Sequence, residues 1–297
     1  MSTQTIEEIR AALLAGRAIP YLGPGVLELA GADCPLPATP LALAGRLTAK
    51  VSVPGKIRNN LTAAAQFIEN FKHRQTVKRA MTEAFSHAVP PTALHQYLAA
   101  LPVLPLLVHV WYDDLPQRAL QDRSDWAMVQ GVSQAEHFGS WVHWFAAGDA
   151  QTSVSPVEGG MPGSAGARLE APVDMSTLLY QPLGSVTPAA NYLVSDSDFV
   201  EVLTEIDIQT PIPEVVQKLR VDRHFLFLGC RFSTQVERIF ARQIMKRSSA
   251  RHWAVIPGEL TRNEQRFLVE QGIERLEMPL EDFVARLSTS VPGVAAA

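Results

Sequence analysis

The chain has 297 residues, of which 47% are hydrophobic and 19% are charged, and its formal net charge is −4 at pH 7. This length accommodates one large domain or one domain with an insertion, and this composition excludes a disordered polypeptide. The negative charge argues against a nucleic-acid partner, because surfaces that bind nucleic acids are usually basic.

The first 15 residues lack an apolar signal core, so we expect a cytoplasmic protein. The longest apolar run, residues 98–110, is broken by two prolines and a histidine, which argues against a membrane-spanning segment or a membrane partner. The two cysteines, Cys34 and Cys230, are too few for a four-cysteine site, so no zinc is expected.

A helix and a glycine-rich strand end come first along the chain. Ile6, Ile9 and Leu13 share one face of a helix predicted over residues 5–15. The apolar run that follows ends in Pro20-Tyr-Leu-Gly-Pro-Gly-Val26. In α/β folds such a turn brings backbone N–H groups close to a phosphate, because glycine has no Cβ to block the approach. The same turn also forms without a ligand, and both interpretations stay open.

The next segment contains a loop, several helices and a buried strand. Residues 27–58 are rich in proline, glycine and alanine, which favours a loop with one short helix near 41–47. Helical patterns follow at residues 61–71, 74–85 and 92–98. The apolar run 104–111 predicts a strand that ends at Tyr112, Asp113 and Asp114.

The composition changes at residues 115–178. This segment contains a cluster of aromatic and histidine residues, interpreted as a helix: His137, Trp141, His143 and Trp144. A Gly/Ser/Pro-rich tract follows at 148–166 and is typical of a flexible loop. We therefore expect a small helical module with a loop, inserted between two parts of one domain, 1–114 and 179–297.

Strands and helices alternate after residue 179. The predicted strands are 192–194, 225–228, 253–256 and 273–276, and the predicted helices are 195–203, 211–220, 234–247, 261–271 and 280–287. This alternation predicts an α/β, Rossmann-like fold in three layers, with helices on both faces of a parallel sheet. Ligands of such sheets bind at the carboxyl ends of the strands, where we expect the two glycine turns and Asp113 to converge.

Four short segments occur in a particular order: Pro20-Tyr-Leu-Gly-Pro-Gly-Val26, His109-Val-Trp-Tyr-Asp-Asp114, Pro182-Leu-Gly-Ser185 and Phe227-Leu-Gly-Cys-Arg-Phe232. Together with the strand-helix tail they resemble the sirtuin-like NAD-binding family, particularly its bacterial stand-alone and defence-associated branch. The resemblance spans residues 18–287 apart from the insertion. It implies NAD or an ADP-ribose-type nucleotide as the ligand.

The resemblance implies a set of cofactor-binding residues on the four motifs: Gly23, Gly25, Val26, Asp113, Gly184, Gly229, Arg231 and Ser233. The first three would cradle a diphosphate through backbone N–H groups, although Pro24 between them lacks a donor. Gly229, Arg231 and Ser233 would hold the adenosine side, where a guanidinium can pair with a phosphate. Asp113 matches the family's motif aspartate, or simply caps the segment that follows it.

Two positions depart from the family. The family has a general-base histidine directly before the third-motif glycine, and this chain has Leu183 there. The second-motif asparagine corresponds to Trp111. Leucine cannot accept a proton, and an indole is larger and offers a single N–H donor. We therefore assign no catalytic residue and expect a catalytically impaired protein that binds a nucleotide and regulates an unknown protein partner. The insertion also permits a homo-oligomer.

Two alternatives stay open. A substitute base from the His137 and His143 cluster would give an active NAD hydrolase or deacylase. A pocket filled by Trp111, Tyr112 and Leu183 would leave a pure protein-interaction module. The family's protein deacylases carry a four-cysteine zinc ribbon, so that activity is the least favoured.

Overall fold

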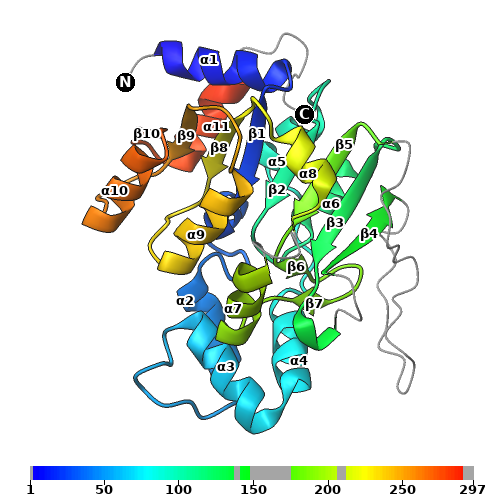
Figure 1. Cartoon of the computed structure of the whole chain (residues 1–297), viewed down its shortest axis with the longest axis vertical. Coiled ribbons are helices and arrows are strands. Elements are labelled where there is room, and N and C mark those ends of the chain that lie inside the picture. The colour runs from blue at the N-terminus through cyan, green and yellow to red at the C-terminus, as the bar shows by residue number, and fades with distance from the viewer. Residues whose placement is uncertain (1–2, 137–140, 148–174, 206–211, 290–297) are drawn as a thin grey trace.

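The computed structural model describes residues 3–136, 141–147, 175–205 and 212–289, and it is built around an eight-stranded sheet (Figure 1). The strand order is β10-β9-β8-β1-β2-β5-β3-β4, and neighbouring strands are parallel except β4, which is antiparallel to β3. The strands are β1 (Ala18–Leu22), β2 (Leu106–His109), β3 (Trp126–Gly131), β4 (Val142–Ala146), β5 (Thr177–Gln181), β8 (His224–Leu228), β9 (His252–Val255) and β10 (Ile273–Leu276).

Each face of the sheet has its own hydrophobic core. Side chains alternate along a strand, so Tyr21 of β1 and Phe227 of β8 belong to one core, whereas Leu22 and Leu228 belong to the other. Strands that are buried on both faces are apolar throughout, which is why these two runs were recognisable in the sequence. The predicted three-layer α/β fold is confirmed.

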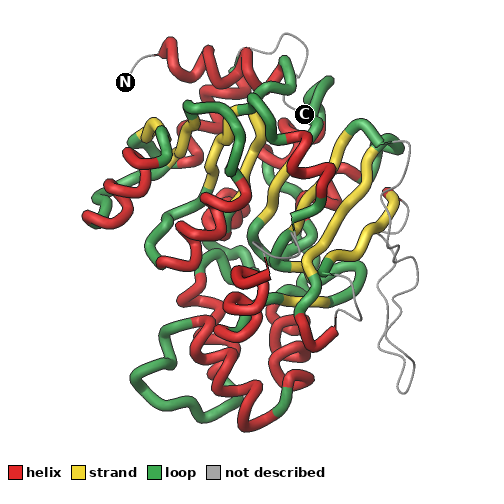
Figure 2. Tube along the Cα trace, in the orientation of Figure 1, coloured by secondary structure: helices red, strands yellow, loops and turns green. Residues whose placement is uncertain are grey.

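Helices cover both faces of the sheet, as Figure 2 shows. One core includes residues of α1 (Thr3–Leu14), α5 (Ala93–Ala99), α6 (Leu115–Leu120) and α11 (Leu280–Ser288). The other core includes residues of α8 (Glu214–Leu219), α9 (Gln235–Ile244) and α10 (Arg262–Glu270). No helix in the described part of the chain is long and apolar enough to cross a membrane.

A group of helices lies beyond one end of the sheet (Figure 1). It consists of α2 (Pro40–Thr48), α3 (Leu61–Lys72), α4 (Arg74–Ala84) and α7 (Asp196–Glu205). The Arg74 guanidinium at the start of α4 donates to the Asp198 carboxylate of α7 at 2.8 Å, and both side chains are largely buried. Asp198 also accepts the backbone N–H groups of Val194 and Ser195, at 2.8 and 2.9 Å. This network fixes α7 against α4.

A hairpin of β6 (Gly184–Ser185) and β7 (Asn191–Tyr192) lies beside these helices. The 3₁₀ helix η1 (Pro24–Ala30) follows β1.

The segment 115–178 differs from the small helical module that was expected. It contributes α6, β3 and β4 to the main fold, together with the 3₁₀ helix η2 (Gln134–Glu136), and β5 begins at its end. His143 and Trp144 lie on β4, where they pair with Gln130 and Val129 of β3. Their helical interpretation is therefore wrong, because pairing with a neighbouring strand decided the local structure. His137 and the tract 148–166 lie outside the described residues.

Candidate functional site

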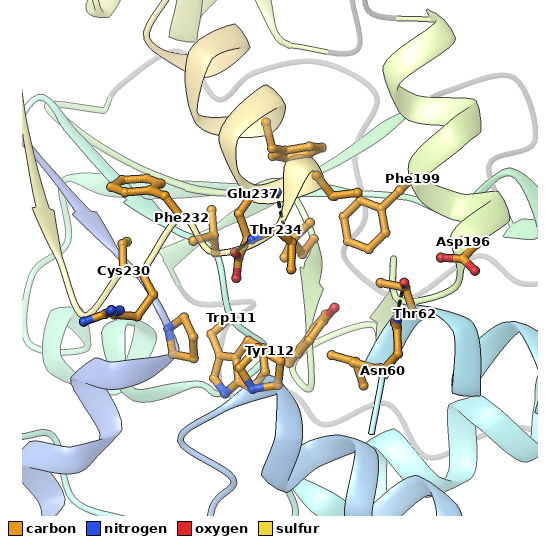
Figure 3. A pocket seen from close by; sticks show the side chains of 18 of the residues that line it. Asn60, Thr62, Trp111, Tyr112, Asp196, Phe199, Cys230, Phe232, Thr234 and Glu237 are labelled. Carbon is orange, nitrogen blue, oxygen red and sulfur yellow. Dashed lines mark hydrogen bonds between the residues drawn. The ribbon is translucent and has the colours of Figure 1, made fainter. Parts of the chain in front are cut away.

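A cavity of about 490 Å³ lies at the carboxyl ends of β1, β2 and β8. Its walls come from the segments that follow these strands and from α3, α7 and α9 (Figure 3). The volume falls within the range of ligand pockets, roughly 300–1,000 Å³. The cavity also lies where ligands of doubly wound sheets bind.

The two glycine turns meet at one side of this cavity. The Gly23 N–H donates to the Leu228 carbonyl at 2.8 Å, and the Gly25 N–H donates to the Gly229 carbonyl at 3.0 Å. Gly229 has a φ of +67°, and a Cβ added there would lie 2.4 Å from the Val26 nitrogen. Glycine is required at this point because one backbone packs directly on another. The expected convergence of the two turns is present.

This packing changes the role of the first turn. The Val26 N–H donates to the Gly23 carbonyl at 3.2 Å, and Pro24 has no N–H to offer. The backbone N–H groups of Gly23, Gly25 and Val26, which were expected to cradle a diphosphate, are thus all engaged within the protein. Of residues 23–26, Pro24 lines the cavity.

The second turn leads into a helix cap that the sequence analysis missed. The Thr234 hydroxyl accepts the Glu237 N–H at 3.2 Å, and one oxygen of the Glu237 carboxylate accepts the Thr234 N–H at 2.8 Å. The Ser233 hydroxyl donates to the same oxygen at 3.1 Å. In Figure 3, Thr234 and Glu237 lie across the cavity from Trp111 and Tyr112. The signal was the Thr-x-x-Glu capping box directly after a glycine turn.

Arg231 lines the cavity, but its guanidinium is bound elsewhere. It donates to the Pro257 and Glu259 carbonyls, both at 2.8 Å. Its Nε lies 3.3 Å from the Glu264 carboxylate, whose side chain is 1% exposed. The loop after β9 and the start of α10 thus hold the cation that was expected to pair with a phosphate.

Trp111 and Tyr112 form a fixed aromatic wall. The Trp111 indole N–H donates to the Pro37 carbonyl at 2.9 Å, and its ring packs against Phe85 and Tyr112. The Tyr112 hydroxyl donates to the Leu193 carbonyl at 2.7 Å. Burial raises the pKa of Tyr112 well above its ordinary value, so this hydroxyl stays protonated. Both polar atoms are occupied by backbone carbonyls.

The third motif contributes Leu183 to the cavity wall. Gly184 does not line the cavity. It has a φ of +78°, and an added Cβ would lie 2.1 Å from the Asn191 carbonyl oxygen. Gly184 is therefore required by the β6–β7 hairpin. Asp196 and Phe199 of α7 complete this side of the cavity, and neither was predicted.

Asp113 is buried behind the aromatic wall. One oxygen lies 3.2 Å from His109 Nε2, and the other accepts the Leu115 N–H at 3.1 Å. Burial alone would raise the pKa of Asp113, but the His109 ring and the hydrogen bonds bring the pKa below its ordinary value. Asp113 therefore caps the following segment and pairs with a histidine. The neighbouring Asp114 pairs with Arg118 at 2.8 Å.

The predicted ligand residues separate into two groups. Arg231 lines the cavity, as do Trp111 and Leu183 at the two positions that depart from the family. The remaining predicted residues belong to the frame around it: Gly23, Gly25, Val26, Asp113, Gly184, Gly229 and Ser233. Within the described residues, no group of three or more histidine, cysteine, aspartate or glutamate side chains is placed to hold a metal ion.

A mostly parallel sheet with helices on both faces defines a Rossmann-like α/β protein, and the cavity lies where such folds bind ligands. The family model described as the SIR2-like domain matches residues 105–276, which is more than half of the chain. The chain therefore belongs to the SIR2-like family, and the predicted resemblance to sirtuins is confirmed. SIR2-like domains typically bind NAD, which links the chain to NAD-related function. No curated protein matches the chain.

A buried histidine behind the site predicts acid sensitivity. The His95 ring accepts the Thr92 N–H at 3.4 Å, and burial lowers its pKa from 6.5 to about 4. The unfolded chain binds this proton below about pH 6.5, whereas the folded chain does so only near pH 4. The free energy of unfolding should therefore fall by up to about 3 kcal/mol as the pH drops through this window.

The variant His95→Gln tests this coupling, because glutamine keeps an acceptor for the helix cap and does not titrate. Urea denaturation between pH 7 and pH 4 should show a smaller loss of stability for His95→Gln than for the parent. The surface variant His87→Gln serves as the control and should follow the parent. An unchanged pH dependence in His95→Gln would contradict the assignment.

Proposed function

We propose that this chain is a catalytically impaired SIR2-like protein. In this proposal the cavity holds an NAD-derived ligand, meaning NAD, ADP-ribose or a part of either, and leaves its N-glycosidic bond intact. The observation that carries the proposal is an open cavity whose wall has Trp111 and Leu183 at the positions of the family's asparagine and general base. Neither side chain can take a proton from a ribose hydroxyl.

The other groups at the cavity support the loss of chemistry. Among the described residues that line it, none is a histidine. Burial raises the pKa of Tyr21, Tyr112 and Cys230 well above their ordinary values, so none is an ionised base or nucleophile near neutral pH. His143 lies on β4, and β5 and β3 separate that strand from β2. Among the described residues that line the cavity, the candidates for a substitute base are therefore the two carboxylates, Asp196 and Glu237.

The open volume also favours a ligand over a filled pocket. Trp111, Tyr112 and Leu183 line the cavity and leave about 490 Å³ between them and the facing helices. The walls combine the sheet end with α3 and α7, so a bound ligand would bridge these parts. In our proposal the binding of a protein partner depends on whether a ligand bridges these parts, and the ligand thereby regulates the interaction.

The proposal predicts binding without cleavage. Incubation of the full chain with NAD should release nicotinamide no faster than buffer does, measured by chromatography. Calorimetry should detect binding of at least one of NAD, ADP-ribose and their nucleosides. Release of nicotinamide that is lost in Glu237→Gln or Asp196→Asn would instead identify an active hydrolase. A failure of all these ligands to bind would favour the interaction module.

A further inference from the structure

The first glycine turn offers a diphosphate no free N–H group. The N–H groups of Gly23, Gly25 and Val26 donate to carbonyls of the protein, and Pro24 has none. A diphosphate bound beside this turn would therefore have to displace backbone hydrogen bonds that hold the two glycine turns together. Anion sites in related folds instead present unpaired N–H groups to the phosphate.

The charges at the cavity also disfavour an anion. Arg231 is the one cationic side chain among the described residues that line it, and Glu264 and two carbonyls already hold its guanidinium. Asp196 and Glu237 place two carboxylates on the facing walls. A diphosphate would be brought beside like charges, which repel it most strongly where water is excluded.

The same cavity suits a ligand that has a flat ring, uncharged or cationic, together with hydroxyl groups. Most of its remaining wall is apolar or aromatic, including Val110, Trp111, Tyr112, Phe199 and Phe232. Aromatic walls stack on flat heterocycles. The second oxygen of Glu237, Oε1, has no hydrogen-bond partner within the described residues and can accept from a hydroxyl. Carboxylates favour a cationic ring for the same reason that they repel a phosphate.

Building on the proposed function, we propose that the cavity selects nucleosides, with a neutral or cationic base on ribose, over nucleoside diphosphates. Glu237 is the residue that determines this selectivity, through hydrogen bonding to ribose hydroxyls and repulsion of phosphate. The SIR2-like cavity of this chain thus accepts a part of NAD in place of the whole dinucleotide.

Calorimetric titration of the full chain with adenosine, nicotinamide riboside, ADP-ribose and NAD tests this selectivity. The two nucleosides should bind at least tenfold more tightly than the two diphosphates. Higher salt should narrow the gap, because salt screens the repulsion of the anionic ligands and leaves adenosine unaffected. The variant Glu237→Gln keeps the capping box and removes the charge, so ADP-ribose should gain about tenfold in affinity relative to adenosine.

The control is Glu214→Gln, which removes a carboxylate from the first turn of α8, outside the cavity. It should leave all four affinities unchanged. ADP-ribose binding more tightly than adenosine would overturn the selectivity and leave the proposed function intact. If Glu237→Gln left the ratio of the affinities for ADP-ribose and adenosine unchanged, the role of this carboxylate would also be overturned. Failure of all four ligands to bind would remove the selectivity and the proposed function together.

Discussion

Replacement of Gly229 by alanine should lower the free energy of unfolding by about 3 to 5 kcal/mol. The backbone at Gly229 has a φ of +67°, and the added Cβ would lie 2.4 Å from the Val26 nitrogen and 2.8 Å from the Gly25 carbonyl carbon. Both neighbours are backbone atoms, which cannot rotate away. The two glycine turns would have to separate. Chemical denaturation followed by circular dichroism measures the loss.

Gly258 provides a matched control for this effect. Its φ is +69°, but an added Cβ would meet no atom within 4 Å. Gly258→Ala should therefore cost only the backbone strain, about 1 kcal/mol. Equal losses of unfolding free energy in Gly229→Ala and Gly258→Ala would show that the contact between the two glycine turns contributes nothing to stability.

Replacement of Asp113 by alanine should also destabilise the protein, by about 3 to 5 kcal/mol at pH 7. The change leaves the buried His109 ring without its carboxylate and the Leu115 N–H without its acceptor. Asp114→Ala is the neighbouring control. Asp114 pairs with the partly exposed Arg118 at 2.8 Å, and its loss should cost less than about 1 kcal/mol.

The effect of Asp113 should depend on pH in a defined direction. Its pKa in the folded protein lies below the ordinary value, so its contribution is fully present above about pH 4 and is lost as the pH falls through the lowered pKa. The difference between Asp113→Ala and the parent should shrink in acid. A difference that is the same at pH 7 and pH 3, or a loss in Asp114→Ala of equal size, would contradict this account.

The sequence predicted most of the elements that frame the cavity. Near-continuous apolar runs identified β1 and β8, because both strands are buried on both faces. The helix predicted over residues 261–271 is α10, and Thr261 and Glu264 cap its first turn by reciprocal hydrogen bonds. The alternation of strands and helices also predicted a ligand site at the carboxyl ends of the strands, where the cavity lies.

Other elements depend on contacts that are distant in sequence. The strand β4 is defined by its pairing with β3. Its five residues, Val142–Ala146, show no strong periodicity of their own. The strand β5 (Thr177–Gln181) was not predicted from the sequence, although it is as long as β1 and β8. Its place between β2 and β3 follows from long-range pairing alone.

The residues of the first glycine turn could not predict which acceptors its backbone N–H groups bind. Gly-x-Gly motifs can present N–H groups to a ligand or donate them to a neighbouring turn, and the local sequence is the same in both cases. The Gly25–Gly229 hydrogen bond decides between them, and it joins residues far apart in the chain. The acceptors that hold the Arg231 guanidinium likewise come from the loop after β9, which is distant in sequence.

Equilibrium dialysis of the full chain, run once with NAD and once with nicotinamide riboside, tests the central claim most directly. Chromatography of both compartments reports binding and bond cleavage in the same sample. The account predicts an excess of intact ligand on the protein side, larger for nicotinamide riboside than for NAD, with nicotinamide at the level of buffer. Accumulation of free nicotinamide above that level would contradict it. So would the absence of binding, seen as each ligand at the same concentration on both sides of the dialysis membrane.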